Sequence, residues 1–183
     1  MNLRSFAEHR PRLGPRVWID PAAVVIGEVE IGEDSSVWPM AVVRGDVHRI
    51  RIGARTNLQD GVIVHVTHDG PFGPEGGLPC RIGDDVTVGH GAILHACTIE
   101  DAALIGMGAR VLDGAVVRRH GYVGAGALVA PGKVVGEGEL WLGSPARCVR
   151  RLSAREIEQL HYSAQHYVRL KDRYRAMTAA EDG

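Results

Sequence analysis

Aromatic residues and cysteines are scarce in this sequence. Phe, Trp and Tyr make up 5% of the 183 residues, and the three cysteines show no CxxC spacing. An odd number of cysteines without such spacing argues against a disulfide framework. So few aromatics are also unusual for a helix-rich globule. Because hydrophobic residues still make up 45% of the chain, the core must be built mainly from aliphatic side chains.

Neither sign of charge predominates, and long apolar runs are lacking. The 21 basic and 22 acidic residues give a net charge of −1, so there is no electrostatic case for binding nucleic acid or an anionic membrane. No apolar stretch approaches the roughly 18 residues of a membrane span. Residues 1–15 contain no apolar signal-peptide core. We therefore expect one cytoplasmic domain with no membrane or nucleic-acid partner.

What the sequence does contain is glycine, with 24 residues, and a short aliphatic repeat. Ile, Leu or Val recurs mostly every six positions, and a small residue often stands two positions before it. Eighteen of the nineteen repeat markers are Ile, Leu or Val. The markers are Ile19, Val25, Ile31, Val37, Val43, Ile52, Leu58, Val64, Ile82, Val88, Leu94, Ile99, Ile105, Val111, Val117, Val123, Val129, Val135 and Trp141.

A six-residue unit fits a short strand and a bend, and such units stack as a solenoid. Three faces per coil gives about six coils, so we predict a mainly β protein built as a parallel β-helix of hexapeptide repeats. We divide the chain into an N-terminal arm (1–18), the β-helix (19–146) with an extruded loop (66–81), and a C-terminal helix and tail (147–183). Ser153 and Glu156 form a capping box at the start of that helix, which we expect to span about 20–25 residues.

The repeat brings two histidines together. Val64 and Leu94 are equivalent markers on successive coils, so the residues that follow them, His65 and His95, lie on one face in register. Strands stack about 4.8 Å apart, which lets two imidazoles converge on one ion. His90 lies around a corner and could join them only from another subunit, as in a threefold assembly. An all-histidine site favours Zn²⁺, with Fe²⁺ or Co²⁺ as alternatives.

The chain from about Ile19 to Pro145 resembles the γ-class carbonic anhydrases and their bacterial relatives. The tail from Tyr162 to Val168 is similar to the YrdA-type branch of that family. Hexapeptides alone are shared with many acyltransferases, whereas their combination with the histidines is specific. The motif residues are Arg44-Gly45-Asp46, Asn57-Leu58-Gln59-Asp60, His65, His90 and His95.

The resemblance implies a homotrimeric left-handed β-helix that hydrates carbon dioxide to bicarbonate. His65, His90 and His95 would be the metal ligands, and zinc would supply hydroxide near neutral pH. Gln59 would orient this hydroxide, and Arg44 could stabilise the charge of bicarbonate. Arg44, Asp46 and Asp60 would form a polar cluster beside the metal at the interface, with Asp60 in register below His90; a purely structural ion-pair network between subunits is the alternative, and the two roles are compatible. Asn57 would support the site from the interface.

The proton shuttle is where the sequence departs from the archaeal prototype of the family. Val47 stands where the prototype has a glutamate, and His68 falls where its shuttle glutamate would sit. A histidine can relay protons near neutral pH, although His68 could equally be a loop residue without a catalytic role. The activity could therefore be weak. On the C-terminal helix, Tyr162, His161 or His166 could reach the site, or could simply pack against the β-helix.

Three other functions stay open on the sequence. The first is acyl transfer with coenzyme A on the same scaffold, which needs a general-base histidine and a basic patch. Only the small cluster Arg118, Arg119 and His120 offers such a patch, and it is typical of a solvated turn. The second is a metal-dependent acyl-CoA thioesterase. The third is a non-catalytic trimeric scaffold that keeps its metal for stability.

Overall fold

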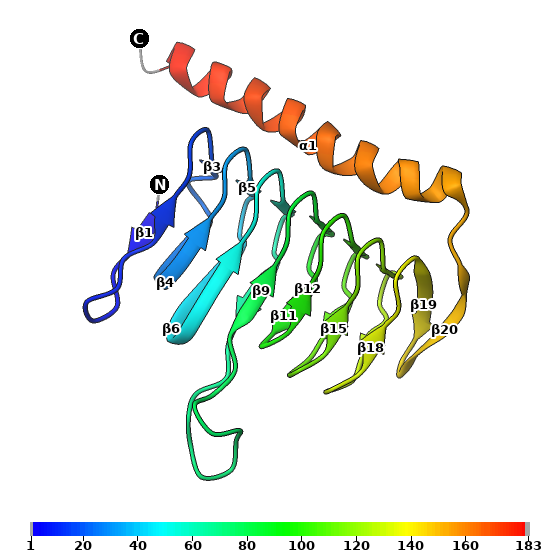
Figure 1. Cartoon of the computed structure of the whole chain (residues 1–183). Helices are drawn as coiled ribbons and strands as arrows, with labels where there is room; N and C mark the ends of the chain where they lie inside the picture. Colours follow the sequence, from blue (N-terminus) through cyan, green and yellow to red (C-terminus); the bar gives the residue numbers. More distant parts are fainter. Residues whose placement is uncertain (1, 182–183) are drawn as a thin grey trace.

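The chain forms a parallel β-solenoid covered along one side by a single long helix (Figure 1). This computed structural model describes residues 2–181, so Met1, Asp182 and Gly183 of the expected arm and tail lie outside the described residues. Short strands follow one another around three faces, and each pairs in parallel with its equivalents on neighbouring coils. The predicted mainly β class and the solenoid of hexapeptide repeats are confirmed.

The strands of each face are bounded as follows. The first face contains β1 (Asn2–Arg4), the first half of β4 (Val24–Ile31) and of β6 (Val42–Ile52), β8 (Ile63–His65), β11 (Ile93–His95), β14 (Arg110–Val111) and β17 (Leu128–Val129). The second face contains β2 (Arg12–Leu13), the second halves of β4 and β6, β9 (Cys80–Ile82), β12 (Thr98–Ile99), β15 (Val116–Val117) and β18 (Val134–Val135). The third face contains β3 (Trp18–Ile19), β5 (Ser36–Val37), β7 (Asn57–Leu58), β10 (Thr87–Val88), β13 (Leu104–Ile105), β16 (Tyr122–Val123) and β19 (Glu139–Gly143), and ends on the antiparallel strand β20 (Ala146–Arg151).

The aliphatic markers form the core, as the repeat predicts. Their side chains stack in columns inside the solenoid, and Val25, Val43, Val64 and Leu94 on the first face are each 0% exposed. Burial of such a side chain contributes about 1.5–3 kcal/mol relative to leaving it exposed. Because this core repeats with every coil, it fixes the register of the residues beside each marker.

The expected N-terminal arm is instead part of the solenoid. β1 and β2 both pair in parallel with β4, so the first coil begins near Asn2 rather than at residue 19. Six residues before Ile19, Leu13 continues the marker series toward the N-terminus. A tight turn closed by Phe6 and His9 then separates Leu13 from Leu3, so the six-residue spacing ends at Leu13. The solenoid consequently has more turns than the nineteen markers predict.

The extruded loop hangs from the solenoid between β8 and β9 (Figure 1). Its neck is closed by Thr67 and Leu78, whose backbone groups exchange hydrogen bonds of 3.1 and 2.9 Å. β9 already begins at Cys80, so the loop ends two residues before the predicted boundary at 81.

The helix α1 (Ala154–Glu181) runs back along the solenoid from its C-terminal to its N-terminal end (Figure 1). The predicted capping box is confirmed, because the Ser153 backbone N–H donates to Glu156 at 2.8 Å and the Glu156 N–H donates to the Ser153 hydroxyl at 3.3 Å. At 28 residues α1 is longer than expected, since no glycine or proline interrupts it before Gly183. In the described chain no helix is long and apolar enough to cross a bilayer.

The scarce aromatic residues gather where α1 meets the third face. The Trp38 ring lies 4.8 Å from Trp18, 5.4 Å from Tyr167 and 5.2 Å from Tyr174, measured between ring centroids. Further charged contacts join α1 to one corner of the solenoid, where each coil turns with a residue in the left-handed conformation. We call this edge the α1 corner; its turn residues are Arg16, Asp34, Arg55, Asp85, Ala102 and His120, with φ between 53 and 58°.

Candidate metal centre

His65 and His95 lie next to each other on the first face. They end strands β8 and β11 and are direct partners in the parallel ladder, which confirms the register predicted from the repeat. The Nδ1 atom of His65 lies 3.2 Å from the Nε2 atom of His95, and the ring centroids are 5.2 Å apart. The solenoid thus brings together two imidazole nitrogens from residues thirty positions apart.

A carboxylate orients each ring from its other nitrogen. Asp113 Oδ1 lies 2.6 Å from Nδ1 of His95, and Asp46 Oδ1 lies 3.1 Å from Nε2 of His65. In the neutral rings these nitrogens donate to the carboxylates, which assigns the lone pairs to the two nitrogens that face each other. Two lone pairs at that distance repel unless a cation lies between them. Two ligands of a tetrahedral zinc ion, each at 2.0–2.1 Å, are about 3.3 Å apart, so the pair fits a metal.

The electrostatics keep both carboxylates ionised. Burial acts to raise the pKa of Asp46, but hydrogen bonds from Arg44 and His65 outweigh it and leave that pKa below its ordinary value. Burial likewise opposes the hydrogen bonds from Thr67 and His95 that lower the pKa of Asp113. The pKa of His65 is lowered, chiefly by burial and further by Arg44, although Asp46 opposes this. A neutral His65 is the form that binds a metal.

The predicted polar cluster is split between two corners of the chain. Arg44 forms an ion pair with Asp46 beside the histidines, as expected. Asp60 does not join them within one chain, because it follows a third-face marker and its Oδ2 atom lies 2.8 Å from Nδ1 of His90. Only a neighbouring chain could bring this second group to the first, so the predicted placement of Asp60 in register with His90 is confirmed and the cluster at an interface stays a prediction.

His90 lies apart from the other two histidines, as its position around the corner predicts. Its side chain is 48% exposed, and Asp60 beneath it is 49% exposed. Among the side chains of residues 2–177, which the structure describes, no group of three His, Cys, Asp or Glu in one chain could hold a metal ion. A complete three-histidine centre therefore requires a second chain.

Gln59 and Asn57 form a hydrogen-bonded chain under the third face. The Gln59 side-chain amide donates to Asn57 Oδ1 at 3.1 Å, and the Asn57 amide donates to Thr87 Oγ1 at 3.1 Å. Thr87 in turn donates to the hydroxyl of Ser163 on α1 at 3.2 Å. Because its amide nitrogen is engaged, Gln59 has its carbonyl oxygen available to a partner in the adjoining cavity. That cavity has a volume of about 350 Å³ and is also lined by His90 and Tyr167.

Two other predicted residues lie away from the histidine pair. His68 is exposed on the loop, one residue after Thr67, and no contact within the described chain joins its ring to His65 or His95. Tyr162 is 65% exposed on α1, where it stacks on His166 at 6.1 Å and lies under the guanidinium of Arg169 at 5.6 Å. Their roles in an assembled site stay predictions.

Asp113 is a site residue that the sequence analysis missed. It stands two positions after the marker Val111, one coil beyond His95, and it also accepts a hydrogen bond from the Thr67 hydroxyl. The available signal was an acidic residue on the coil next to a predicted ligand. A carboxylate partner for a metal-binding histidine is common, because it fixes the ring and raises its basicity.

Replacing Asp113 with Asn should weaken zinc binding about 10- to 100-fold. The amide can still accept from His95 but no longer holds a negative charge against the ring. Zinc affinity measured by chelator competition tests this, with Glu75→Gln at the exposed loop tip as the control. An unchanged affinity would exclude Asp113 from the metal centre.

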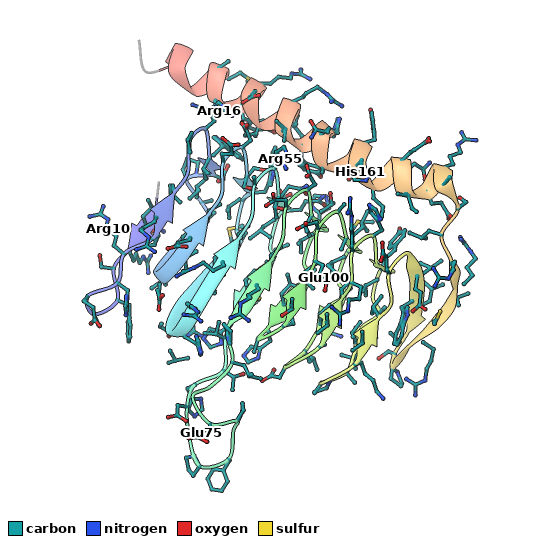
Figure 2. All side chains as sticks on the ribbon, in the orientation of Figure 1. Arg10, Arg16, Arg55, Glu75, Glu100 and His161 are labelled. Atoms are coloured by element: carbon teal, nitrogen blue, oxygen red, sulfur yellow. The ribbon has the colours of Figure 1, made fainter. Side chains whose placement is uncertain are left out.

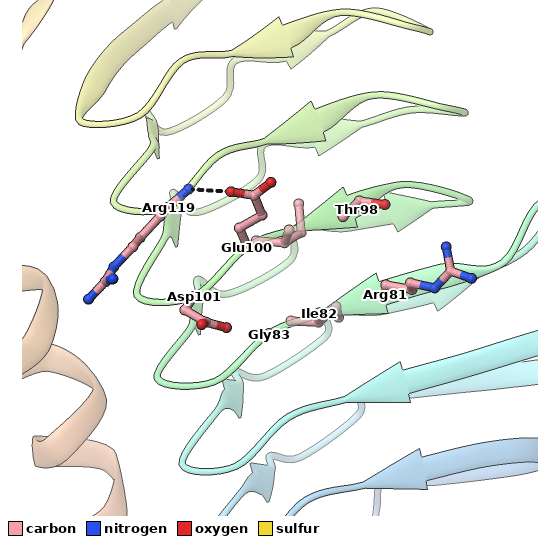
Figure 3. Close-up of a pocket in the computed structure, with 8 residues that line it drawn as sticks. Arg81, Ile82, Gly83, Thr98, Glu100, Asp101 and Arg119 are labelled. Carbon is pink, nitrogen blue, oxygen red and sulfur yellow. Dashed lines mark hydrogen bonds between the residues drawn. The ribbon is translucent and has the colours of Figure 1, made fainter.

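A second hollow of about 350 Å³ lies between β9 and β12 and contains none of these histidines (Figure 3). Both of its acidic side chains are already engaged. Glu100 accepts from the Arg119 backbone at 3.0 Å and from Arg118 at 2.6 Å, and Asp101 accepts from the Asp84 backbone at 2.9 Å. Figure 3 shows the Arg119 side chain directed away from Thr98 and Arg81. This hollow lacks the convergent groups of the histidine pair.

Comparison with known proteins relates the chain to two groups. Residues 10–45 match the bacterial transferase hexapeptide (six repeats) family. The chain is 49% identical to Protein YrdA of Escherichia coli over 94% of its length and 93% of that protein. It is 45% identical to gamma carbonic anhydrase 2, mitochondrial, of Arabidopsis thaliana, over 92% of this chain and 60% of that protein. A Methanocaldococcus jannaschii protein named "Probable carbonic anhydrase" is 42% identical over 87% of this chain and 96% of its own.

A solved structure extends the comparison to proteins named as transferases. The hexapeptide transferase family protein from Anaplasma phagocytophilum has a TM-score of 0.87 and 39% identity, covering 94% of this chain and 98% of its own. The same solenoid fold therefore occurs in proteins named carbonic anhydrases and in proteins named transferases, so the chemistry must be argued from the side chains.

Proposed function

We propose that the chain, which belongs to the hexapeptide-repeat family that contains YrdA and the gamma carbonic anhydrases, catalyses the reversible hydration of carbon dioxide to bicarbonate. The reaction would take place at the interfaces of a zinc-containing homotrimer. The observation that carries this proposal is the pair of imidazole nitrogens of His65 and His95, 3.2 Å apart and each held from behind by a carboxylate. A purely structural surface would gain nothing from two lone pairs directed at each other.

The metal would be held by Nδ1 of His65 and Nε2 of His95 from one chain and by His90 from its neighbour. His90 is exposed and already oriented by Asp60 at 2.8 Å, so it is available to a second chain. Zinc in such a site supplies hydroxide near neutral pH by lowering the pKa of water to about 7, a value known from other carbonic anhydrases. Three imidazoles also suit Fe²⁺ or Co²⁺.

The remaining residues would position the substrate and manage charge. Gln59 would present its carbonyl oxygen to the attacking hydroxide, since its amide nitrogen is already bound to Asn57. Arg44 lies beside the histidines and would offset the negative charge of bicarbonate. Its ion pair with Asp46 already neutralises part of the positive charge of Arg44. Asp46 and Asp113 would hold the ligand rings in place.

His68 would carry the proton away during turnover. Thr67, the residue before it, bonds Asp113, and Asp113 bonds His95, so the base of the loop is tied to the histidine pair. Replacing His68 with Ala should slow hydration about 10- to 100-fold in dilute buffer and have little effect in concentrated imidazole, which can carry the proton instead. Stopped-flow rates in both buffers test this. Equal rates for the variant and the wild type in dilute buffer would reject His68 as the shuttle.

An acyl-thioester substrate is the second candidate, and one observation favours it. The cavity beside Gln59 and His90 has a volume of about 350 Å³, which is far more than carbon dioxide fills. A metal-dependent thioesterase or an acyltransferase could use this space. Acyl transfer alone, however, would not require His65 and His95 to converge. A non-catalytic trimeric scaffold would keep the metal without either reaction.

Stopped-flow hydration of carbon dioxide, compared with acyl-CoA hydrolysis, separates these functions. The protein should be loaded with zinc or with iron in the absence of oxygen. We expect hydration above the buffer rate with at least one metal. Acyl-CoA hydrolysis without hydration would favour the thioesterase, and neither activity in an intact, metal-loaded trimer would favour the scaffold.

A further inference from the structure

A second pair of histidines joins α1 to the solenoid, far along the chain from the first. The Nε2 atom of His120, on the α1 corner, lies 3.1 Å from the Nε2 atom of His161, on the N-terminal half of α1. The rings are nearly perpendicular, at 75°, with centroids 5.1 Å apart. Figure 2 labels His161 on the helix above the solenoid. His161 is exposed and His120 half-buried, so the pair is open to solvent.

The separation of the two nitrogens matches a shared metal ion. Two neighbouring ligands at about 2.1 Å from a tetrahedral or octahedral ion lie about 3.0–3.4 Å apart. We propose that His120 and His161 form a second metal site, which binds a divalent transition ion such as Zn²⁺, Ni²⁺ or Cu²⁺ and fastens α1 to the solenoid. Imidazole is a good ligand for these ions. Among the side chains described, those of residues 2–177, no third His, Cys, Asp or Glu completes the site, so water would fill the other positions.

The backbone at His120 indicates that its side chain is used. His120 has φ 57°, a left-handed conformation that glycine adopts at less cost. The equivalent turns on another corner do use glycine, at Gly61, Gly91, Gly108 and Gly126. On the α1 corner, where Ala102 shows that a side chain without polar groups is also accepted, the polar turn residues are engaged: Asp34 pairs with Lys171 of α1, and Arg55 pairs with Asp85. His120 is likewise engaged, by His161.

The charges around the pair leave an imidazole free to bind. Burial, Arg119 and His161 lower the pKa of His120, and Glu137 opposes them. The neutral imidazole is the form that binds a metal. Arg118, the other nearby cation of this turn, is engaged by Glu100 at 2.6 Å. The positive charge of Arg119 weakens the site, and the negative charge of Glu137 strengthens it.

The site lies where α1 covers the candidate substrate cavity. Ser163, two residues after His161, accepts from Thr87 in the hydrogen-bonded chain that leads to Gln59. An ion at His120 and His161 would thus hold the part of α1 that borders this cavity. Such a contact stabilises the docked helix by an amount that rises with the logarithm of the free ion concentration once that exceeds the dissociation constant.

Nickel titration of the zinc-loaded full-length protein tests the proposal. Equilibrium dialysis should show a nickel-binding event in the wild type that is absent from both His120→Asn and His161→Gln. The matched control is His166→Gln, which removes an exposed histidine on the same helix whose ring contacts Tyr162 and Tyr167, and which should bind nickel as the wild type does. Far-UV circular dichroism would confirm that α1 is retained in every variant.

Two results would overturn the second site. Nickel binding that survives in both His120→Asn and His161→Gln would place the ion elsewhere. A wild type that takes up no nickel beyond these variants at millimolar concentration would leave the pair as a hydrogen bond between two rings. All of these variants keep His65, His90 and His95, so the comparison does not depend on whether the proposed catalytic centre is correct.

Discussion

Replacing His90 with alanine should remove zinc from the protein and lower carbon dioxide hydration by more than about a hundredfold. Loss of a partner that only orients a ligand already costs 10- to 100-fold, and His90 is proposed as a ligand itself. Its side chain is 48% exposed in one chain, so its removal leaves the core of each solenoid unchanged. Zinc content by elemental analysis and stopped-flow hydration measure both effects.

His9→Ala is the matched control for His90→Ala, because it removes a histidine of the first coil whose side chain is 44% exposed and which lies outside the proposed centre. We expect its zinc content and hydration rate to equal those of the wild type. If His90→Ala kept full zinc and full activity, the metal would have to be held by other residues.

Replacing Asp34 with Asn should destabilise the protein by about 2–3 kcal/mol. The Lys171 side chain is 0% exposed, and its amine lies 2.8 Å from Asp34 and 2.6 Å from Asp172. Breaking a buried ion pair commonly costs 3–5 kcal/mol because it leaves a charge without a partner; Asp172 remains here and lessens the cost. Urea unfolding at one fixed protein concentration measures the free energy of unfolding.

Asp172→Asn is the control, because Asp172 is 54% exposed whereas the Asp34 side chain is 15% exposed. We expect Asp172→Asn to cost at most about 1 kcal/mol, the usual value of an exposed pair. Equal losses for the two variants would show that the Asp34 contact does not anchor α1.

Asp34 also makes the free energy of unfolding depend on pH under acidic conditions. The hydrogen bond from Arg16, and then that from Lys171, lower the pKa of Asp34 to about 2 although burial opposes them. The contribution of the ion pair is therefore complete above about pH 4, where the carboxylate is ionised even in the unfolded chain, and it is lost as the pH falls toward 2. The wild type should lose stability in this range more steeply than Asp34→Asn.

The repeat made the histidine pair predictable from the sequence. Val64 and Leu94 are buried markers on successive coils, and the core fixes their register, so the positions of His65 and His95 follow without further information. The same logic separated His90 from them. Where the six-residue period is regular, the face of the solenoid on which a marker lies determines the position of the residues next to it.

Contacts that depend on how far a side chain reaches were not predictable in this way. Asp113 reaches back one coil to His95, although the repeat alone gave no reason to join these two positions. The first coil was missed because a turn closed by Phe6 and His9 breaks the spacing of the markers.

The contacts of α1 with the solenoid could not be predicted from the sequence either. The period of the solenoid does not determine where a separate helix docks along it, so neither the buried pair of Lys171 with Asp34 nor the approach of His161 to His120 could be derived. The helix itself was predictable from its capping box.

The most direct test of a metal centre shared between chains is complementation between two inactive variants. His90→Ala keeps the His65–His95 pair, and His65→Ala keeps His90, so each alone should bind no zinc at this site. When the two are unfolded together and refolded as mixed trimers, random assembly should place an intact pair against an intact His90 at about a quarter of the interfaces. Recovery of about a quarter of the wild-type zinc and hydration rate is the predicted result. A mixture as inactive as its components, although mixed trimers have formed, would contradict the shared centre.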